Sequence, residues 1–86
     1  MTVADEDLAD RVRRLVVETA RLPLSPSALP ADQPLHGPES AGLSSLDVFE
    51  LVMAVEETFG VRVKDEEISG LNSVEAIATY VRERRG

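Results

Sequence analysis

The sequence contains no cysteine and a single histidine, His36. Without cysteine there are no disulfide bonds, no thiolate nucleophile and no cysteine zinc site. One histidine cannot form a histidine metal cluster, and the sequence shows no nucleophile with an adjacent base. Three aromatic residues are too few for a surface on which nucleic acid bases stack. These absences predict that the chain is not an enzyme, has no catalytic residue and holds no metal ion.

Basic residues are also scarce, because nine lysines and arginines face sixteen aspartates and glutamates, for a net charge of −7. Such a chain is repelled by nucleic acids and by anionic membranes, whereas a partner with a basic surface would attract it. No apolar run is long enough to cross a bilayer. The acidic segment Met1–Asp10 lacks the basic and apolar parts of a signal peptide, which predicts a cytoplasmic protein.

Eighty-six residues, 43% of them hydrophobic, predict one domain over residues 1–86 with a modest core. All five prolines lie between residues 23 and 38, where regular helix is therefore disfavoured. The segments on either side show helical periodicity. We expect an all-α fold, a small bundle of three main helices with one short helix and a long first loop.

The expected helices span residues 5–21, 44–60, 65–69 and 72–84, and the proline-rich loop spans residues 22–43. The expected core-facing stripe of the first helix consists of Leu8, Val12, Leu15, Val16 and Thr19. Regularly spaced leucines should pin the long loop to the core, whereas His36 should face solvent. The last helix should bury a stripe made of Val74, Ile77, Ala78 and Val81.

Helix ends are marked by capping residues. Ser44 followed by Asp47 three positions later favours a helix start, and Gly60 favours a left-handed stop. In the last helix we expect Asn72 as the N-cap and Glu75 at the third helical position.

The second helix is apolar on two faces. The core stripe consists of Val48, Leu51, Val52, Val55 and Phe59. Leu46, Phe49 and Met53 form a second stripe on the opposite side, where the charged residues are all acidic. This stripe either packs under the long loop or forms a docking surface with an acidic rim. We favour docking, and predict a partner-docking face made of Leu46, Asp47, Phe49, Glu50, Met53, Glu56 and Glu57.

The segment Gly42-Leu43-Ser44-Ser45-Leu46-Asp47 and its continuation to Gly60 resemble the acyl carrier protein family. The family motif reads Asp-Ser-Leu at the start of the second helix, after a Gly-Leu or Gly-Ala pair. The likeness covers residues 42–82 well, whereas the first helix matches only in pattern and the proline-rich loop matches poorly. Because the likeness extends over residues 42–82, it is stronger evidence than the short motif alone would be.

The resemblance implies that Ser45 is the attachment site of 4′-phosphopantetheine, which a phosphopantetheinyl transferase adds from coenzyme A. The arm would hold acyl groups as thioesters, so that the chain needs no cysteine. The position of Ser45 at a predicted helix N-terminus, where unpaired N–H groups favour a phosphate, agrees with this role. One departure is Ser44, since the family has aspartate there; serine keeps the capping role but not the charge.

We therefore interpret the chain as a freestanding, monomeric acyl carrier protein. Its partners would be the transferase and acyl-loading and acyl-processing enzymes with basic docking surfaces. The departure at Ser44 favours polyketide, fatty-acid-like or other secondary-metabolite biosynthesis over the general fatty-acid role. Two alternatives stay open: an aminoacyl or peptidyl carrier, which Ser44 mildly favours, and a helical interaction module that never carries the arm.

Overall fold

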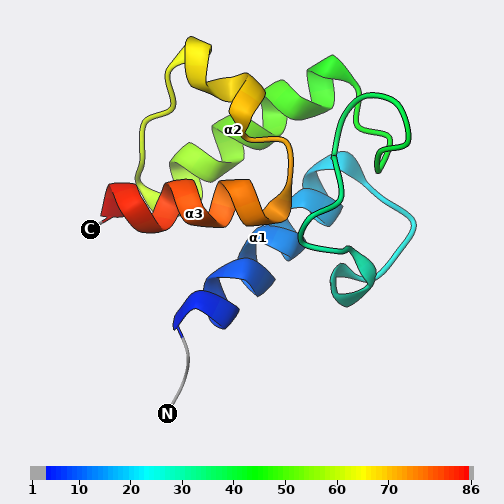
Figure 1. Ribbon diagram of the computed structural model, residues 1–86, viewed down its shortest axis with the longest axis horizontal. Helices are drawn as coiled ribbons and strands as arrows, with labels where there is room; N and C mark the ends of the chain where they lie inside the picture. The colour runs from blue at the N-terminus through cyan, green and yellow to red at the C-terminus, as the bar shows by residue number, and fades with distance from the viewer. Residues whose placement is uncertain (1–3, 86) are drawn as a thin grey trace.

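The computed structural model describes residues 4–85, with side chains described for residues 8–84. It contains the α-helices α1 (Ala4–Ala20), α2 (Ser45–Phe59) and α3 (Val74–Arg85) and the short 3₁₀ helices η1 (Pro26–Ala28) and η2 (Asp65–Gly70) (Figure 1). No strand occurs among the described residues, and the expected all-α fold is confirmed. Met1–Val3, part of the segment used to argue against a signal peptide, lies outside the described residues.

Helix α1 packs against both α2 and α3, and the apolar faces of the three helices form one core. Val12 and Val16 of α1 and Val74 and Val81 of α3 are completely shielded from solvent. The rest of the core comes from the three helices and the connections between them: Leu8, Leu29, Leu35, Leu43, Leu51, Val52, Val55, Phe59, Val63, Leu71, Ile77 and Ala78. The expected stripes of α1, α2 and α3 are confirmed, except that Leu15, Thr19 and Val48 are only half-buried.

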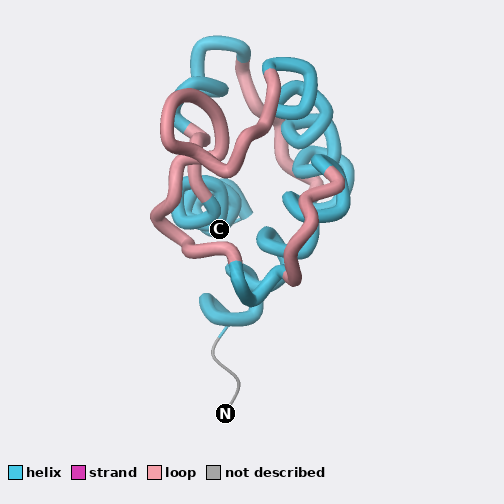
Figure 2. Tube along the Cα trace, turned by 90° about the vertical axis from the view of Figure 1, so that its right-hand side faces the viewer, coloured by secondary structure: helices cyan, strands magenta, loops and turns pink. Residues whose placement is uncertain are grey.

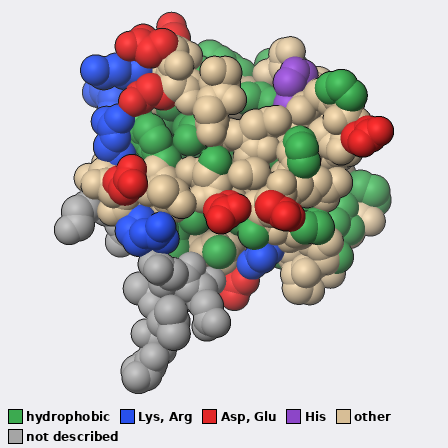
Figure 3. Space-filling view, viewed as in Figure 1, with side chains coloured by type: hydrophobic (Ala, Val, Ile, Leu, Met, Phe, Trp, Pro, Cys, Tyr) green, Lys and Arg blue, Asp and Glu red, His purple; other side chains and the backbone are tan. Residues whose placement is uncertain are grey.

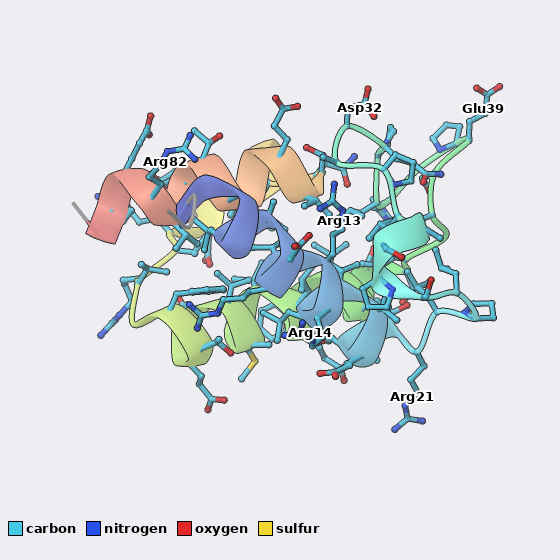
Figure 4. All side chains as sticks on the ribbon, turned by 90° about the horizontal axis from the view of Figure 1, so that it is seen from below. Arg13, Arg14, Arg21, Asp32, Glu39 and Arg82 are labelled. Carbon is cyan, nitrogen blue, oxygen red and sulfur yellow. The ribbon has the colours of Figure 1, made fainter. Side chains whose placement is uncertain are left out.

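The long first loop lies on the outside of the helices and is held to them by its leucines (Figure 2). Leu29 and Leu35 are buried, and Leu24 is half-buried, so the expected pinning is confirmed. Arg13 adds a polar tie, because its Nε donates to the carbonyl of Leu29 at 2.9 Å. Figure 4 shows Arg13 turned toward this loop, whereas Arg21 points away from the protein. The loop thus has a defined path without regular helix.

The ends of α2 follow the capping signals. Gly60 closes the helix in the left-handed conformation, with φ 69° and ψ 33°, a region that costs glycine little. The start of α3 corrects one prediction. Ser73, not Asn72, is the N-cap: its Oγ accepts a hydrogen bond from the N–H of Ala76 at 3.0 Å, which places Glu75 second in the helix. The amide of Asn72 is occupied elsewhere, by the backbone of His36.

Glu67 joins η2 to α3. Its carboxylate accepts hydrogen bonds from the Tyr80 hydroxyl at 2.6 Å, from the backbone N–H of Lys64 at 3.2 Å and from the guanidinium of Arg84. Arg84 also lies over the Tyr80 ring, 4.5 Å from its centroid. The hydrogen bond from Tyr80 is the main cause that lowers the pKa of Glu67, while burial raises the pKa of Tyr80.

This contact predicts an acid-side dependence of stability. A carboxylate whose pKa is lower in the folded protein stabilises it above about pH 4.5, its ordinary value, and this contribution disappears as the pH falls through the folded value. We expect the free energy of unfolding of Glu67→Gln, measured by urea titration between pH 3 and pH 6, to fall less steeply toward low pH than that of the native protein. Parallel curves would contradict this assignment.

Candidate functional site

The start of α2 presents two adjacent serines in different roles. Ser44 is the N-cap: its Oγ accepts from the N–H of Asp47 at 3.1 Å, and its own N–H donates to Asp47 Oδ2 at 3.0 Å. Ser45 is the first residue of the helix and is exposed. Within the described part of the chain its hydroxyl has no hydrogen-bond partner. Ser45 therefore offers a free hydroxyl where backbone N–H groups and the helix dipole favour a phosphate.

This division of roles predicts that two alanine substitutions differ in their effect on stability. Ser44→Ala removes the capping hydrogen bond and should lower the free energy of unfolding by about 1 kcal/mol. Ser45→Ala removes no hydrogen bond within the described structure and should leave stability unchanged. Urea unfolding of both variants beside the native protein checks this; an equal loss in both would mean that the serines share the cap.

A cavity of about 440 Å³ opens beside Ser45, between the first loop at His36, the start of α2 and the segment from η2 to Asn72. Its polar lining residues are His36, Ser45, Asp65, Ser69 and Asn72, and its apolar ones are Val48, Phe49, Ile68 and Leu71. Figure 3 shows the histidine side chain beside hydrophobic side chains on this part of the surface. The cavity is large enough and apolar enough to shelter a hydrocarbon group attached near Ser45. Its contributors come from three segments, so the sequence pattern did not reveal it.

The prediction that His36 faces solvent is confirmed, but the residue also has partners that the sequence did not show. The residue is exposed, but its Nδ1 lies 2.8 Å from the carbonyl oxygen of Leu43, and its backbone pairs with the side chain of Asn72. These partners lie 7 and 36 positions away in the sequence. No local signal could have shown the pairing, because it depends on how the loop folds back.

The outer face of α2 carries three exposed large apolar side chains, with exposed fractions of 65% for Leu46, 54% for Phe49 and 51% for Met53. The alternative that this stripe packs under the long loop is therefore wrong. Exposed clusters of this kind are typical of surfaces that bind partners.

The acids around this stripe differ in their contacts. Glu50 and Glu57 are exposed and form no hydrogen bond or ion pair within residues 8–84. Asp47 belongs to the capping box, and Glu56 Oε2 accepts a hydrogen bond from the N–H of Val63 at 2.8 Å. The two fully available charges on this face are thus Glu50 and Glu57.

Other site types find no support in the described residues. Among them no group of three histidine, aspartate or glutamate side chains is arranged to hold a metal ion. Nor is any described helix both long and apolar enough to cross a membrane.

Comparison with known proteins places this geometry in a family. Residues 10–81 match the family described as "Phosphopantetheine attachment site". The chain belongs to the acyl carrier protein family. An acyl carrier protein from Campylobacter hominis is 40% identical over 75 residues, which cover 87% of this chain and 90% of that relative. One from Akkermansia muciniphila is 34% identical over 84 residues, or 98% of this chain and the full length of the relative. A third, from Zymomonas mobilis, is 33% identical over 79 residues, covering 92% and 96%.

Family membership confirms several predictions. The chain is a carrier and not an enzyme, and its cofactor is covalently attached 4′-phosphopantetheine. Phosphopantetheinyl transferases and biosynthetic enzymes are its partners in general terms. The residues at the start of α2 fit such a group, since Ser45 supplies a free hydroxyl and most of the exposed surface of the neighbouring cavity is apolar.

Proposed function

We propose that Ser45 carries the phosphopantetheine arm and that the protein presents acyl intermediates on it to partner enzymes. The observation that carries this proposal is the exposed, unbonded hydroxyl of Ser45 at the first position of α2, beside an adjacent serine that already caps the helix. The arm supplies a thiol on which acyl groups are held as thioesters.

In the transfer the Ser45 Oγ forms a bond to the phosphorus of the phosphopantetheine group. The pyrophosphate bond of coenzyme A breaks, adenosine 3′,5′-bisphosphate leaves, and the serine proton passes to a base. No nucleophile-activating pair lies at Ser45 in the described structure, so the base belongs to the transferase. This chain contributes the accessible hydroxyl and the positive end of the helix dipole.

The cargo is an acyl group, and the pathway is polyketide, fatty-acid-like or other secondary-metabolite biosynthesis in the cytoplasm. The apolar lining of the cavity next to Ser45 supports an acyl cargo over an aminoacyl one, because burial of apolar surface favours hydrocarbon chains. Ser44 in place of an acidic residue supports a specialised carrier. Partner enzymes dock on the exposed stripe of α2, formed by Leu46, Phe49 and Met53 with the acids around it.

Incubation with coenzyme A, Mg²⁺ and a permissive phosphopantetheinyl transferase tests the proposal by intact mass. The native protein should gain one phosphopantetheine group, and Ser45→Ala, which retains the cap and the fold, should gain none. An unmodified native protein, folded and tried with several transferases, would instead favour an interaction module without the arm.

A further inference from the structure

The loop in front of α2 closes on itself just before the candidate attachment site. The N–H of Ala41 donates to the carbonyl of Pro34 at 2.9 Å, and the N–H of Leu43 donates to the carbonyl of Leu35 at 2.9 Å. A single bridge pairs His36 with Leu43. The chain therefore enters the cap of α2 from a closed loop, and the buried side chains of Leu35 and Leu43 hold its two ends in the core.

Asn72 ties this loop to the base of α3. Its side-chain Oδ1 accepts a hydrogen bond from the N–H of His36 at 2.9 Å, and its Nδ2 donates to the carbonyl of the same residue at 3.1 Å. Its own carbonyl accepts from the N–H of Leu35 at 3.0 Å. One residue thus makes three hydrogen bonds to two loop residues. Because Asn72 pairs with both the N–H and the C=O of His36, it fixes the position and the orientation of the His36 backbone, which a single hydrogen bond would not do.

The imidazole of His36 continues the connection to α2. Its Nδ1 lies 2.8 Å from the carbonyl oxygen of Leu43, the residue directly before the Ser44 cap. A carbonyl oxygen can only accept, so Nδ1 carries the proton. His36, Asn72 and Ser45 also line the same cavity. A continuous chain of hydrogen bonds therefore leads from the start of α3 to the residue before the cap.

We propose that Asn72 and His36 are positioning residues for phosphopantetheine transfer to Ser45, and this rests on the function proposed above. They act through the backbone of Leu43, which sets how the chain enters α2 and how the Ser45 hydroxyl faces the transferase. Asn72, His36 and the backbone of Leu43 form a clasp, and no hydrogen bond or ion pair joins it to the docking stripe of α2 among the described residues, although Phe49 lines the same cavity. Loss of the clasp should therefore affect the reaction of bound carrier and not its binding, because a small misplacement of a reacting group slows the chemical step.

Steady-state kinetics of the transfer test this proposal. Asn72→Ala and His36→Ala should each lower kcat by about tenfold and leave KM for the carrier unchanged. His36→Asn should restore most of kcat, because the asparagine Nδ2 occupies nearly the place of the histidine Nδ1 and can donate to the Leu43 carbonyl. Asp32→Ala is the control. It changes an exposed side chain of the long first loop that takes no part in these hydrogen bonds, and its kcat and KM should equal those of the native protein (Figure 4).

Amide hydrogen exchange on the unmodified proteins gives a readout that needs no transferase. The amide of Leu43 should exchange faster in both alanine variants, whereas the core amides of α1 should keep their native rates. If Asn72→Ala proves to be unfolded, the comparison of His36→Ala with His36→Asn tests the proposal on its own.

A native kcat in both alanine variants would overturn the positioning role and leave the attachment site at Ser45 standing. A rise in KM with unchanged kcat, or an asparagine variant as slow as His36→Ala, would also overturn it. A native protein that accepts no arm at all would instead overturn the proposed function, and the positioning role with it.

Discussion

Leu35→Ala is expected to lower the free energy of unfolding by about 3 kcal/mol, because it leaves a cavity where a leucine side chain was almost completely buried. Leu35 is 1% exposed, and its carbonyl accepts one of the two hydrogen bonds that close the loop before α2. A domain of this size has only roughly 3–5 kcal/mol of stability, so the variant should retain no more than about 2 kcal/mol and unfold at a much lower urea concentration. Urea unfolding followed by far-UV circular dichroism measures the loss.

Leu46→Ala is the matched control, since the same side chain is removed from an exposed position on α2. Its stability should stay close to that of the native protein. A small loss in Leu35→Ala would show that the proline-rich loop is not a part of the core. The comparison therefore separates leucines that hold the fold from those available to partners.

Reversal of two charges on α2, in the double variant Glu50→Lys and Glu57→Lys, should slow modification and acyl loading by at least about tenfold at low ionic strength. Both carboxylates are exposed without internal partners among the described residues, and they flank the stripe of Leu46, Phe49 and Met53. A basic partner surface would then meet like charges. Because neither side chain supports the fold, the circular dichroism spectrum and the unfolding curve should not change.

Glu18→Lys with Glu83→Lys gives the same change in net charge at exposed positions on α1 and α3. The rates of this control should change little, and the difference between the two double variants should shrink as salt screens the charges. Equal rates for both at low salt would contradict docking through α2.

Local signals predicted the elements that depend on neighbouring residues. The Ser44–Asp47 capping box and the Gly60 stop were correct because cap, first turn and left-handed terminus lie within a few positions of one another. The exposure of the second apolar stripe on α2 followed from a simple limit: the large side chains on both faces of one helix cannot all be buried in a small fold.

Contacts over long sequence distances were the part that could not be predicted. Both Asn72 and Ser73 are suitable caps by residue type, and the choice between them depends on His36, 36 positions earlier. Likewise Glu56 looks like a free surface acid in the sequence, yet it accepts a hydrogen bond from the backbone of Val63 beyond the end of α2. The cavity beside Ser45 needs three separate segments to be in place.

The most direct test of the account is the location of the arm by tandem mass spectrometry of the modified protein. A peptide that spans Gly42–Val48 contains both Ser44 and Ser45, and its fragment ions separate the two serines. We predict that the phosphopantetheine mass is found on Ser45 alone, since Ser44 is engaged in the helix cap. Phosphopantetheine on Ser44, or on any residue outside this peptide, would contradict the central claim.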